Sequence, residues 1–380
     1  MNYHHITTSL QLADFCRPLH HQAWLAIDTE FVRQDTYYPL LSLVQVCSQQ
    51  GELAIIDPLT IEDMSPLWAL LADKQVCKVF HSARQDIEVL FQVGGLMPQA
   101  IFDTQIACVF LGHGDMAGFA RVIEAELNVQ IDKDQTRTNW HQRPLSDRQI
   151  AYALDDVRYL VPLYQKLQTQ LTDEQKQALE WDFSQLLDAA LYRIDPDQAW
   201  LKLKGTQHLS PKQLGIVKQL CAWRERTAIE TNQPRKWVIS DEAMIALAKR
   251  PARALEGLYK ISEINAGQVR QYGDALIEQL DIAFQQPDSW PEKPAKTLPA
   301  STQEDIVLNL ALAYAHQVAL NNQLNLANLI QRRDVLALLR RQASPIQHGW
   351  RWILIGRELQ DLFSKNAPLK IIDGKLVLTS

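Results

Sequence analysis

The stretch Leu25-Ala26-Ile27-Asp28-Thr29-Glu30-Phe31 runs from an apolar segment into two carboxylates. The apolar residues, with β-branched Ile27, predict a buried strand. Side chains at i and i+2 of a strand point to the same face, so Asp28 and Glu30 project together. Two adjacent anions at the end of a core strand repel each other and lose hydration, and a divalent cation with oxygen ligands offsets both costs. The alternative is that the strand ends at Asp28 and both acids face solvent.

Two later segments supply further acids. Asp86 lies in the first turn of a predicted helix, where an acid can also serve only as a partner of the helix dipole. Tyr152 and Asp156 stand at i and i+4 of a later helix and therefore share a face. Asp155 is turned about a hundred degrees away and is expected to meet solvent. Read alone, Tyr152 and Asp156 could merely mark the edge of an amphipathic packing face.

The predicted elements describe a mixed sheet with helices on its faces, followed by helical blocks. The short gap after the second strand favours antiparallel pairing of the first three strands. Ser146 and Gln149 form a predicted capping box, and prolines mark 285–301 as a linker. The strands are predicted over 24–31, 41–47, 53–57, 76–80 and 100–103, and the helices over 6–21, 67–71, 84–91, 105–111, 117–127 and 146–171, with helical blocks at 210–283 and 302–364.

Composition excludes several classes of protein. The 380 residues suit two or three domains, and the sequence has no run of about 20 apolar residues for a membrane span. Five cysteines without a Cys-x-x-Cys spacing argue against a disulfide framework and favour a reducing cytoplasm, and no signal peptide is expected. The net charge is −6, but its distribution is uneven: residues 1–195 carry −12, whereas 196–283 and 284–380 carry +3 each. This suits an acidic metal-using body with attachments that contact nucleic acid.

The acids taken together resemble the DEDDy branch of the 3′–5′ exonucleases, and more closely the ribonuclease D family. Over about residues 1–195 the resemblance extends to neighbouring motifs, and it continues as an HRDC domain. One departure is Asn139, where the family usually has Asp. The matching motifs are Ile27-Asp28-Thr29-Glu30-Phe31-Val32-Arg33, Tyr37-Tyr38-Pro39, Leu43-Val44-Gln45, Phe80-His81, Phe102-Asp103-Thr104-Gln105 and Arg137-Thr138-Asn139-Trp140, and in the HRDC part Trp237-Val238, Pro251 and Tyr272-Gly273.

The resemblance implies an α/β ribonuclease H-like exonuclease domain, a mixed sheet with flanking helices, followed by two small all-α HRDC-like domains. The implied boundaries are 1–195 for the exonuclease domain, 205–285 for the first HRDC domain, 286–301 for a linker, and 302–380 for a second, diverged HRDC-like helical domain. The implied activity is hydrolysis of RNA from its 3′ end, which releases nucleoside 5′-monophosphates and serves tRNA 3′ processing. RNA, including tRNA precursors and single-stranded 3′ ends, is the implied partner, with no membrane and no obligate protein partner.

The resemblance also implies roles for single residues. Two divalent ions, Mg²⁺ or Mn²⁺, would lie about 4 Å apart. Asp28 would bridge both ions, Glu30 and Asp156 would help hold the first, and Asp86 would hold the second through water. Tyr152 would orient the attacking water, because an ordinary tyrosine pKa of about 10 makes a poor base.

Substrate contacts are predicted with alternatives left open. Arg33, Tyr37 and Tyr38 would contact phosphate and stack a terminal base, or else form a polar loop with two packed tyrosines. His81 would assist the substrate or, as the favoured alternative, cap and pack its turn. Gln45 is a further candidate contact. Competing functions are a DNA 3′–5′ exonuclease and a catalytically silent RNA-binding scaffold.

Overall fold

The computed structural model describes residues 2–132, 134–135, 138–291, 298–364 and 368–378. The chain divides into two units. Unit 1 comprises Met1–Phe31, Leu41–Asp188 and Leu298–Ser380, and unit 2 comprises Val32–Leu40 and Ala189–Thr297. The last helical block thus belongs to the same unit as the sheet, although the proline-rich segment before it separates it from the first helical block in sequence.

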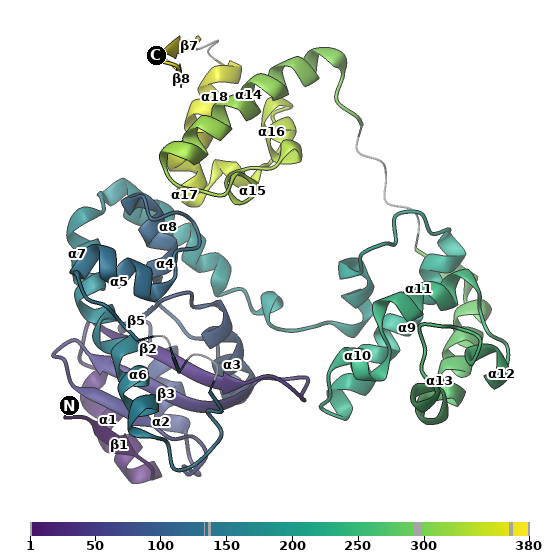
Figure 1. Cartoon of the computed structure of the whole chain (residues 1–380), viewed down its shortest axis with the longest axis horizontal. Helices are drawn as coiled ribbons and strands as arrows, with labels where there is room; N and C mark the ends of the chain where they lie inside the picture. Colours follow the sequence, from purple (N-terminus) through teal and green to yellow (C-terminus); the bar gives the residue numbers. More distant parts are fainter. Residues whose placement is uncertain (1, 133, 136–137, 292–297, 365–367, 379–380) are drawn as a thin grey trace. The chain divides into compact units, whose positions relative to one another are not determined.

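A six-stranded mixed sheet forms the centre of unit 1 (Figure 1). The sequence predicts a mixed sheet with five of these six strands. Its strand order is β1-β4-β3-β2-β5-β6. The β3–β4 pair is antiparallel, whereas β1–β4, β2–β5 and β5–β6 are parallel. The strands are β1 (His4–Ile6), β2 (Trp24–Val32), β3 (Leu40–Ser48), β4 (Leu53–Ile56), β5 (Cys77–Phe80) and β6 (Ile101–Asp103). Strand β1 was not predicted, because three residues are too few to show alternation and its partner β4 lies far along the chain.

Helices cover this sheet. Helix α6 packs on β4, α7 on β5 and α8 on β6, while α1 and α2 pack on each other. The predicted capping box is present, since Ser146 accepts from the Gln149 backbone N–H and Gln149 from that of Ser146. The helices are α1 (Ser9–Leu19), α2 (Ser65–Ala72), α3 (Arg84–Gly94), α4 (Thr104–Ala107), α5 (Phe119–Leu127), α6 (Asp147–Arg158), α7 (Leu160–Gln170) and α8 (Asp173–Leu186), with a 3₁₀ turn at Cys108–Leu111.

The prediction of one helix over 146–171 is wrong. The helix ends at Arg158, and α7 begins at Leu160 after Tyr159. Pro162 has no N–H to donate to the carbonyl of Arg158, and its ring would clash with that carbonyl in a continuous helix. The break lies beyond Tyr152 and Asp156, so these two residues stay on one regular helix.

Unit 2 is helical and has its own core. Leu220, Val217, Met244 and Leu276 are fully buried in it. Its elements are 3₁₀ turns at Ala189–Leu191, Pro196–Lys202 and Pro287–Ser289, and helices α9 (Pro211–Glu230), α10 (Arg235–Val238), α11 (Asp241–Lys249), α12 (Leu255–Leu258) and α13 (Ala266–Gln285).

The third block of the chain ends in a β-hairpin, so the prediction that 302–380 is wholly helical is wrong there. Strands β7 (Leu369–Ile372) and β8 (Lys375–Leu378) pair antiparallel across Asp373 and Gly374, which both have positive φ. Asp-Gly at such a turn is the local signal that could have revealed the hairpin. The preceding elements are α14 (Thr302–Asn321), α15 (Leu326–Leu329), α16 (Arg332–Leu339), a 3₁₀ turn at Pro345–Gln347, α17 (Gly349–Arg351), a π-helical segment at Trp352–Gly356 and α18 (Arg357–Ser364).

The third block is joined to α8 through a buried carboxylate. Asp182 accepts a 2.8 Å hydrogen bond from the backbone N–H of Trp350, and Trp181 stacks on His348 at 5.1 Å between ring centroids. Gly349 makes this approach possible, because its φ is +62° and a Cβ there would lie 2.4 Å from Asp182 Oδ1. A side chain at this position would therefore force α17 away from α8.

Gly349→Ala is accordingly expected to destabilise unit 1 by about 3 kcal/mol, from left-handed backbone strain and the clash with Asp182. Gly51→Ala is the matched control, since Gly51 also has a positive φ but open space around the added Cβ, and it should cost about 1 kcal/mol. Denaturant unfolding of the full chain measures both. Equal losses in the two variants would show that the Asp182 contact adds nothing.

No helix in the described part of the chain combines the length and apolar composition needed to cross a bilayer.

Candidate active site

Strand β2 carries the first two candidate acids out of the core. Leu25, Ala26 and Ile27 are fully buried, whereas Asp28 and Glu30 are half-buried. Their carboxylates, together with that of Asp156 from α6, each offer an oxygen within 4.8 Å of the others. The alternative in which both acids of β2 face bulk solvent is therefore wrong.

Asp86 reaches the same region from the first turn of α3. It is buried, and its Oδ1 accepts a 2.5 Å hydrogen bond from the hydroxyl of Thr29, the residue between Asp28 and Glu30. Asp86 lies outside the group of three mutually close carboxylates, but burial and then the charge of Asp28 raise its pKa. The structure thus brings all four predicted acids to one region, three of them into direct proximity.

Asp103 positions the start of α3, and sequence reasoning missed this role. Its two carboxylate oxygens accept from the backbone N–H groups of Ser82 and Ala83 at 3.0 and 2.8 Å, and Oδ1 also caps α4 at Gln105. Ser82 has a φ of +66°, so these bonds hold an unfavourable backbone conformation just before Asp86. The available signal was Asp103 within a family-like motif, although its partner lies 21 residues away.

Tyr152 lies beside Asp156 on α6, as the i, i+4 spacing predicts. A hydrogen bond from the Tyr152 hydroxyl acts to lower the pKa of Asp156. The Tyr152 ring packs against the buried ring of Trp140, with 6.0 Å between centroids. Trp140 therefore helps to fix where the hydroxyl lies.

Burial raises the pKa of every acid in the group, and the charges of neighbouring acids raise it further for Glu30, Asp86 and Asp156. Burial raises the pKa of Asp28 to about 7, and burial together with the charges of Asp28, Asp156 and Asp86 raises the pKa of Glu30 to about 10. The pKa values of Asp86 and Asp156 are also raised, first by burial and then by Asp28. For all four acids to be ionised at neutral pH, a positive charge must lie close to them. Hard oxygen donors at this spacing fit a divalent metal ion.

Comparisons with known proteins support the two-part organisation. Residues 3–172 match a family described as 3′–5′ exonuclease, and residues 213–280 match the HRDC domain family. A ribonuclease D from Sphingobium indicum is 33% identical, with 98% of each chain covered. Another, from Pseudomonas paraeruginosa, is 38% identical over 77% of this chain and 78% of that one. The chain belongs to the ribonuclease D family.

One solved structure is similar to this ribonuclease D family chain over nearly its whole length. The Escherichia coli RNase D crystal structure, described as that of an exoribonuclease involved in structured RNA processing, superposes with a TM-score of 0.82 at 31% identity. It covers 96% of this chain and 99% of that one. The predicted fold class, an exonuclease domain with a mixed sheet followed by an HRDC domain, is confirmed, as is the prediction of a ribonuclease D-like 3′–5′ exoribonuclease.

Asn139, the departure from the ribonuclease D pattern, braces its own turn. Its Oδ1 accepts a 3.0 Å hydrogen bond from the backbone N–H of His141, and its side chain is exposed. Asp155 pairs with Arg158 at 2.7 Å and is 24% exposed, so it meets solvent only in part. Arg137, part of the same predicted motif as Asn139, lies outside the described residues.

Three of the predicted substrate contacts, Arg33, Tyr37 and Tyr38, belong to unit 2. The Tyr37 hydroxyl donates to Glu225 at 2.8 Å, and its ring is buried in the core of unit 2, against which Tyr38 also packs. The packed-tyrosine alternative is therefore the one that the structure favours. Arg33 lines a cavity of unit 2.

His81 and Gln45 stay within unit 1. His81 Nε2 is 3.0 Å from the carbonyl oxygen of Ala117, and Nδ1 is 2.9 Å from the Thr104 hydroxyl. Burial lowers the pKa of His81. Nε2 donates to the carbonyl of Ala117, and both contacts favour the packing role. Gln45 is fully buried on β3, and its amide meets no hydrogen-bond partner within the described residues.

Proposed function

We propose that this ribonuclease D family member hydrolyses RNA stepwise from the 3′ end and releases nucleoside 5′-monophosphates. The proposed substrates are tRNA precursors and other single-stranded 3′ ends in the cytoplasm. The observation that carries the proposal is the convergence of Asp28, Glu30 and Asp156 within 4.8 Å, with Asp86 held beside them by Thr29. This arrangement supports phosphodiester hydrolysis, because a cluster of carboxylates can hold the divalent cations that stabilise the attacking and leaving oxygens.

The proposed cofactors are two divalent ions, Mg²⁺ or Mn²⁺, because the donors are all hard oxygens. Asp28 would contribute to holding both ions, Glu30 and Asp156 the first, and Asp86 the second. When bound, the ions stabilise the negative charge that develops on the attacking and leaving oxygens. Thr29 fixes the Asp86 carboxylate by its short hydrogen bond, so Asp86 is oriented before the cations arrive.

Tyr152 is the proposed orienting group for the attacking water. Its hydroxyl is already directed at the acidic cluster through the hydrogen bond to Asp156. A hydroxyl can also accept, so it can receive a hydrogen bond from a water while it donates to the carboxylate. Trp140 restricts the ring, which keeps the cost of ordering this group low.

The direct test of the proposed function uses single-stranded RNA and DNA of the same sequence, labelled at either end. With Mg²⁺ or Mn²⁺ we expect a ladder of 5′-labelled RNA products that shorten stepwise, and labelled mononucleotide from the 3′ end. Faster degradation of DNA would support a DNA exonuclease instead. Binding of RNA without cleavage under any of these conditions would contradict the proposal and favour a silent scaffold.

Mg²⁺ is expected to raise the melting temperature of the full chain more at about pH 8 than at about pH 6. With the pKa of Asp28 raised to about 7 and that of Glu30 to about 10, the folded metal-free protein retains protons that the unfolded chain, with ordinary pKa values near 4, has released. Metal-free stability therefore falls as the pH rises from about 4, up to about 7 through Asp28 and up to about 10 through Glu30. A cation favours the ionised acids and removes this loss.

Melting curves with EDTA and with Mg²⁺ at both pH values measure this effect. Asp28→Asn should reduce the difference between the two pH values, because the proposed metal ligand whose pKa lies between them is gone. A shift in melting temperature that is independent of pH would show that the cation binds elsewhere.

A further inference from the structure

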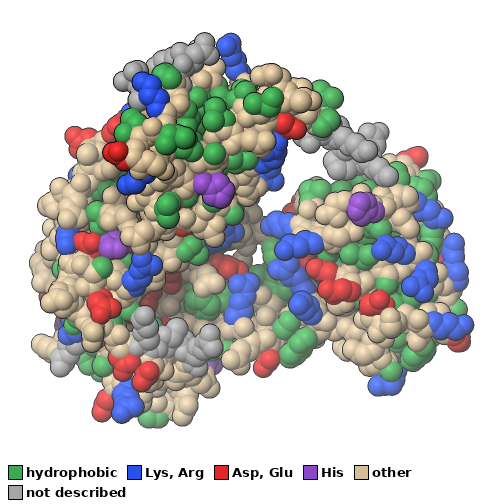
Figure 2. Space-filling view, turned by 45° about the horizontal axis from the view of Figure 1, so that its top comes forward, with side chains coloured by type: hydrophobic (Ala, Val, Ile, Leu, Met, Phe, Trp, Pro, Cys, Tyr) green, Lys and Arg blue, Asp and Glu red, His purple; other side chains and the backbone are tan. Residues whose placement is uncertain are grey.

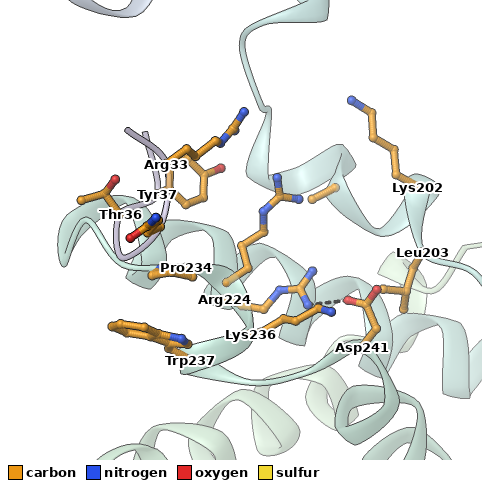
Figure 3. Close-up of a pocket in the computed structure, with 13 residues that line it drawn as sticks. Arg33, Thr36, Tyr37, Lys202, Leu203, Arg224, Pro234, Lys236, Trp237 and Asp241 are labelled. Atoms are coloured by element: carbon orange, nitrogen blue, oxygen red, sulfur yellow. Dashed lines mark hydrogen bonds and ion pairs between the residues drawn. The ribbon is translucent and has the colours of Figure 1, made fainter. Parts of the chain in front are cut away.

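A cavity of about 500 Å³ lies within unit 2, between the segment 32–40 and the first helices of the HRDC part. Figure 3 shows Arg33 and Tyr37 of that segment on one side, Lys202 on the other and Trp237 along the lower edge. The segment is anchored firmly, because the backbone N–H groups of Tyr37 and Tyr38 lie 3.2 and 3.4 Å from Asn232 Oδ1. The cavity is thus a built feature of one unit.

The charges of this cavity leave a positive excess. Arg224 donates to Asp241 at 2.6 Å (dashed in Figure 3), and Arg235 lies 3.6 Å from Glu225, so these four charges balance. The excess comes from Lys202 and Lys236, which also line the cavity. Lys202 and Lys236 are exposed and form no ion pair with any residue that the structure describes. In Figure 2, Lys and Arg side chains also gather on the visible face of this unit.

Trp237 supplies an aromatic surface beside these cations. Its side chain is 52% exposed, whereas the other nine tryptophans of the chain are buried or half-buried. The next residue on the same short helix, Val238, is fully buried, so α10 is held in place by Val238 and does not need Trp237 for its core. An exposed tryptophan next to unpaired lysines is the combination that stacks a base and contacts its phosphates.

We propose that this cavity binds a nucleotide unit of single-stranded RNA, with the base on Trp237 and the flanking phosphates on Lys202 and Lys236. The inference extends the proposed function, on which it rests, by assigning a second RNA contact outside the acidic cluster. It also gives the segment 32–40 a role: Tyr37 is committed to the core, and its burial holds Arg33 at the cavity wall. A free nucleotide offers the same chemistry and is distinguished from a strand by the test.

The test measures binding of a fluorescent single-stranded RNA to the full-length protein in EDTA, where cleavage does not interfere. Trp237→Ala should weaken binding about tenfold, and Trp237→Phe should restore most of the affinity by preserving a stacking surface. The double variant Lys202→Gln, Lys236→Gln should make the negative slope of log affinity against log salt shallower by about 1.4, because two phosphate contacts are lost. Under Mg²⁺, KM for RNA should rise in these variants while kcat is retained.

Matched controls come from the same unit. Tyr259 is exposed and lies outside the cavity, so Tyr259→Ala should not change affinity, and Lys249→Gln should not change the salt slope by more than a fraction of a unit. If the cavity variants keep the affinity and the salt slope of the wild type while RNA is still cleaved, this inference is overturned but the proposed function is not. Absence of cleavage by the wild type would instead overturn the proposed function. 5′-AMP is added as a competitor at concentrations well below those at which salt alone weakens binding. Displacement of the RNA by 5′-AMP would show that the cavity binds a free nucleotide and not a strand. Failure of 5′-AMP to displace the RNA supports the strand.

Discussion

Asp28→Asn is expected to reduce turnover of RNA at least about 100-fold while leaving the protein folded. Asp28 is the acid whose charge bears on all three of the others, Glu30, Asp86 and Asp156. Asparagine keeps the size of the side chain but removes the charge that attracts cations. Because the four acids repel one another without metal, the variant should melt at the same temperature as the wild type in EDTA, or higher. Single-turnover cleavage and melting curves measure the two effects.

Two control variants sharpen this experiment. Asp14→Asn makes the same chemical change at an exposed acid of unit 1 and should leave turnover unchanged. Asp155 pairs with Arg158 and lies outside the cluster, although it is next to Asp156 in sequence. Asp155→Asn should therefore lower turnover much less than Asp28→Asn does. Retention of more than about a tenth of wild-type turnover by Asp28→Asn would contradict the assigned role.

Tyr152→Phe is expected to lower kcat about 10- to 100-fold with little change in affinity for RNA. The substitution removes the hydroxyl that bonds Asp156 and preserves the ring that packs on Trp140. If the hydroxyl orients the attacking water, its loss affects the reaction step and not binding of the strand. Steady-state kinetics separates the two, and binding in EDTA gives the affinity independently.

Tyr159→Phe provides the comparison for Tyr152→Phe. The Tyr159 hydroxyl accepts a 2.6 Å hydrogen bond from Arg158 at the junction of α6 and α7, so this control removes a hydroxyl that has no assigned part in the reaction. It should change kcat less than twofold. A loss in Tyr152→Phe confined to affinity, or matched by Tyr159→Phe, would make Tyr152 a binding or packing residue.

The short-range pattern of the sequence was sufficient to predict which candidate site residues share a face of β2 or of α6. Alternation along β2 places Asp28 and Glu30 on one side, and the helical repeat places Tyr152 and Asp156 on one face. Both periodicities depend only on backbone geometry within a few residues. Local signals also located the capping box at Ser146, and Pro162 was available as a signal for the break that the sequence prediction missed.

Contacts between distant parts of the chain decided the rest. Tyr37 is a core residue whose hydroxyl donates a hydrogen bond to Glu225, 188 positions away. The sequence around Tyr37 reads as a polar loop and does not indicate this partner. Likewise, Trp350 bonds Asp182 across 168 positions, which joins the last block to the unit that contains the sheet. Packing of this kind depends on which surfaces meet after the local elements have formed, so residue periodicity alone does not specify it.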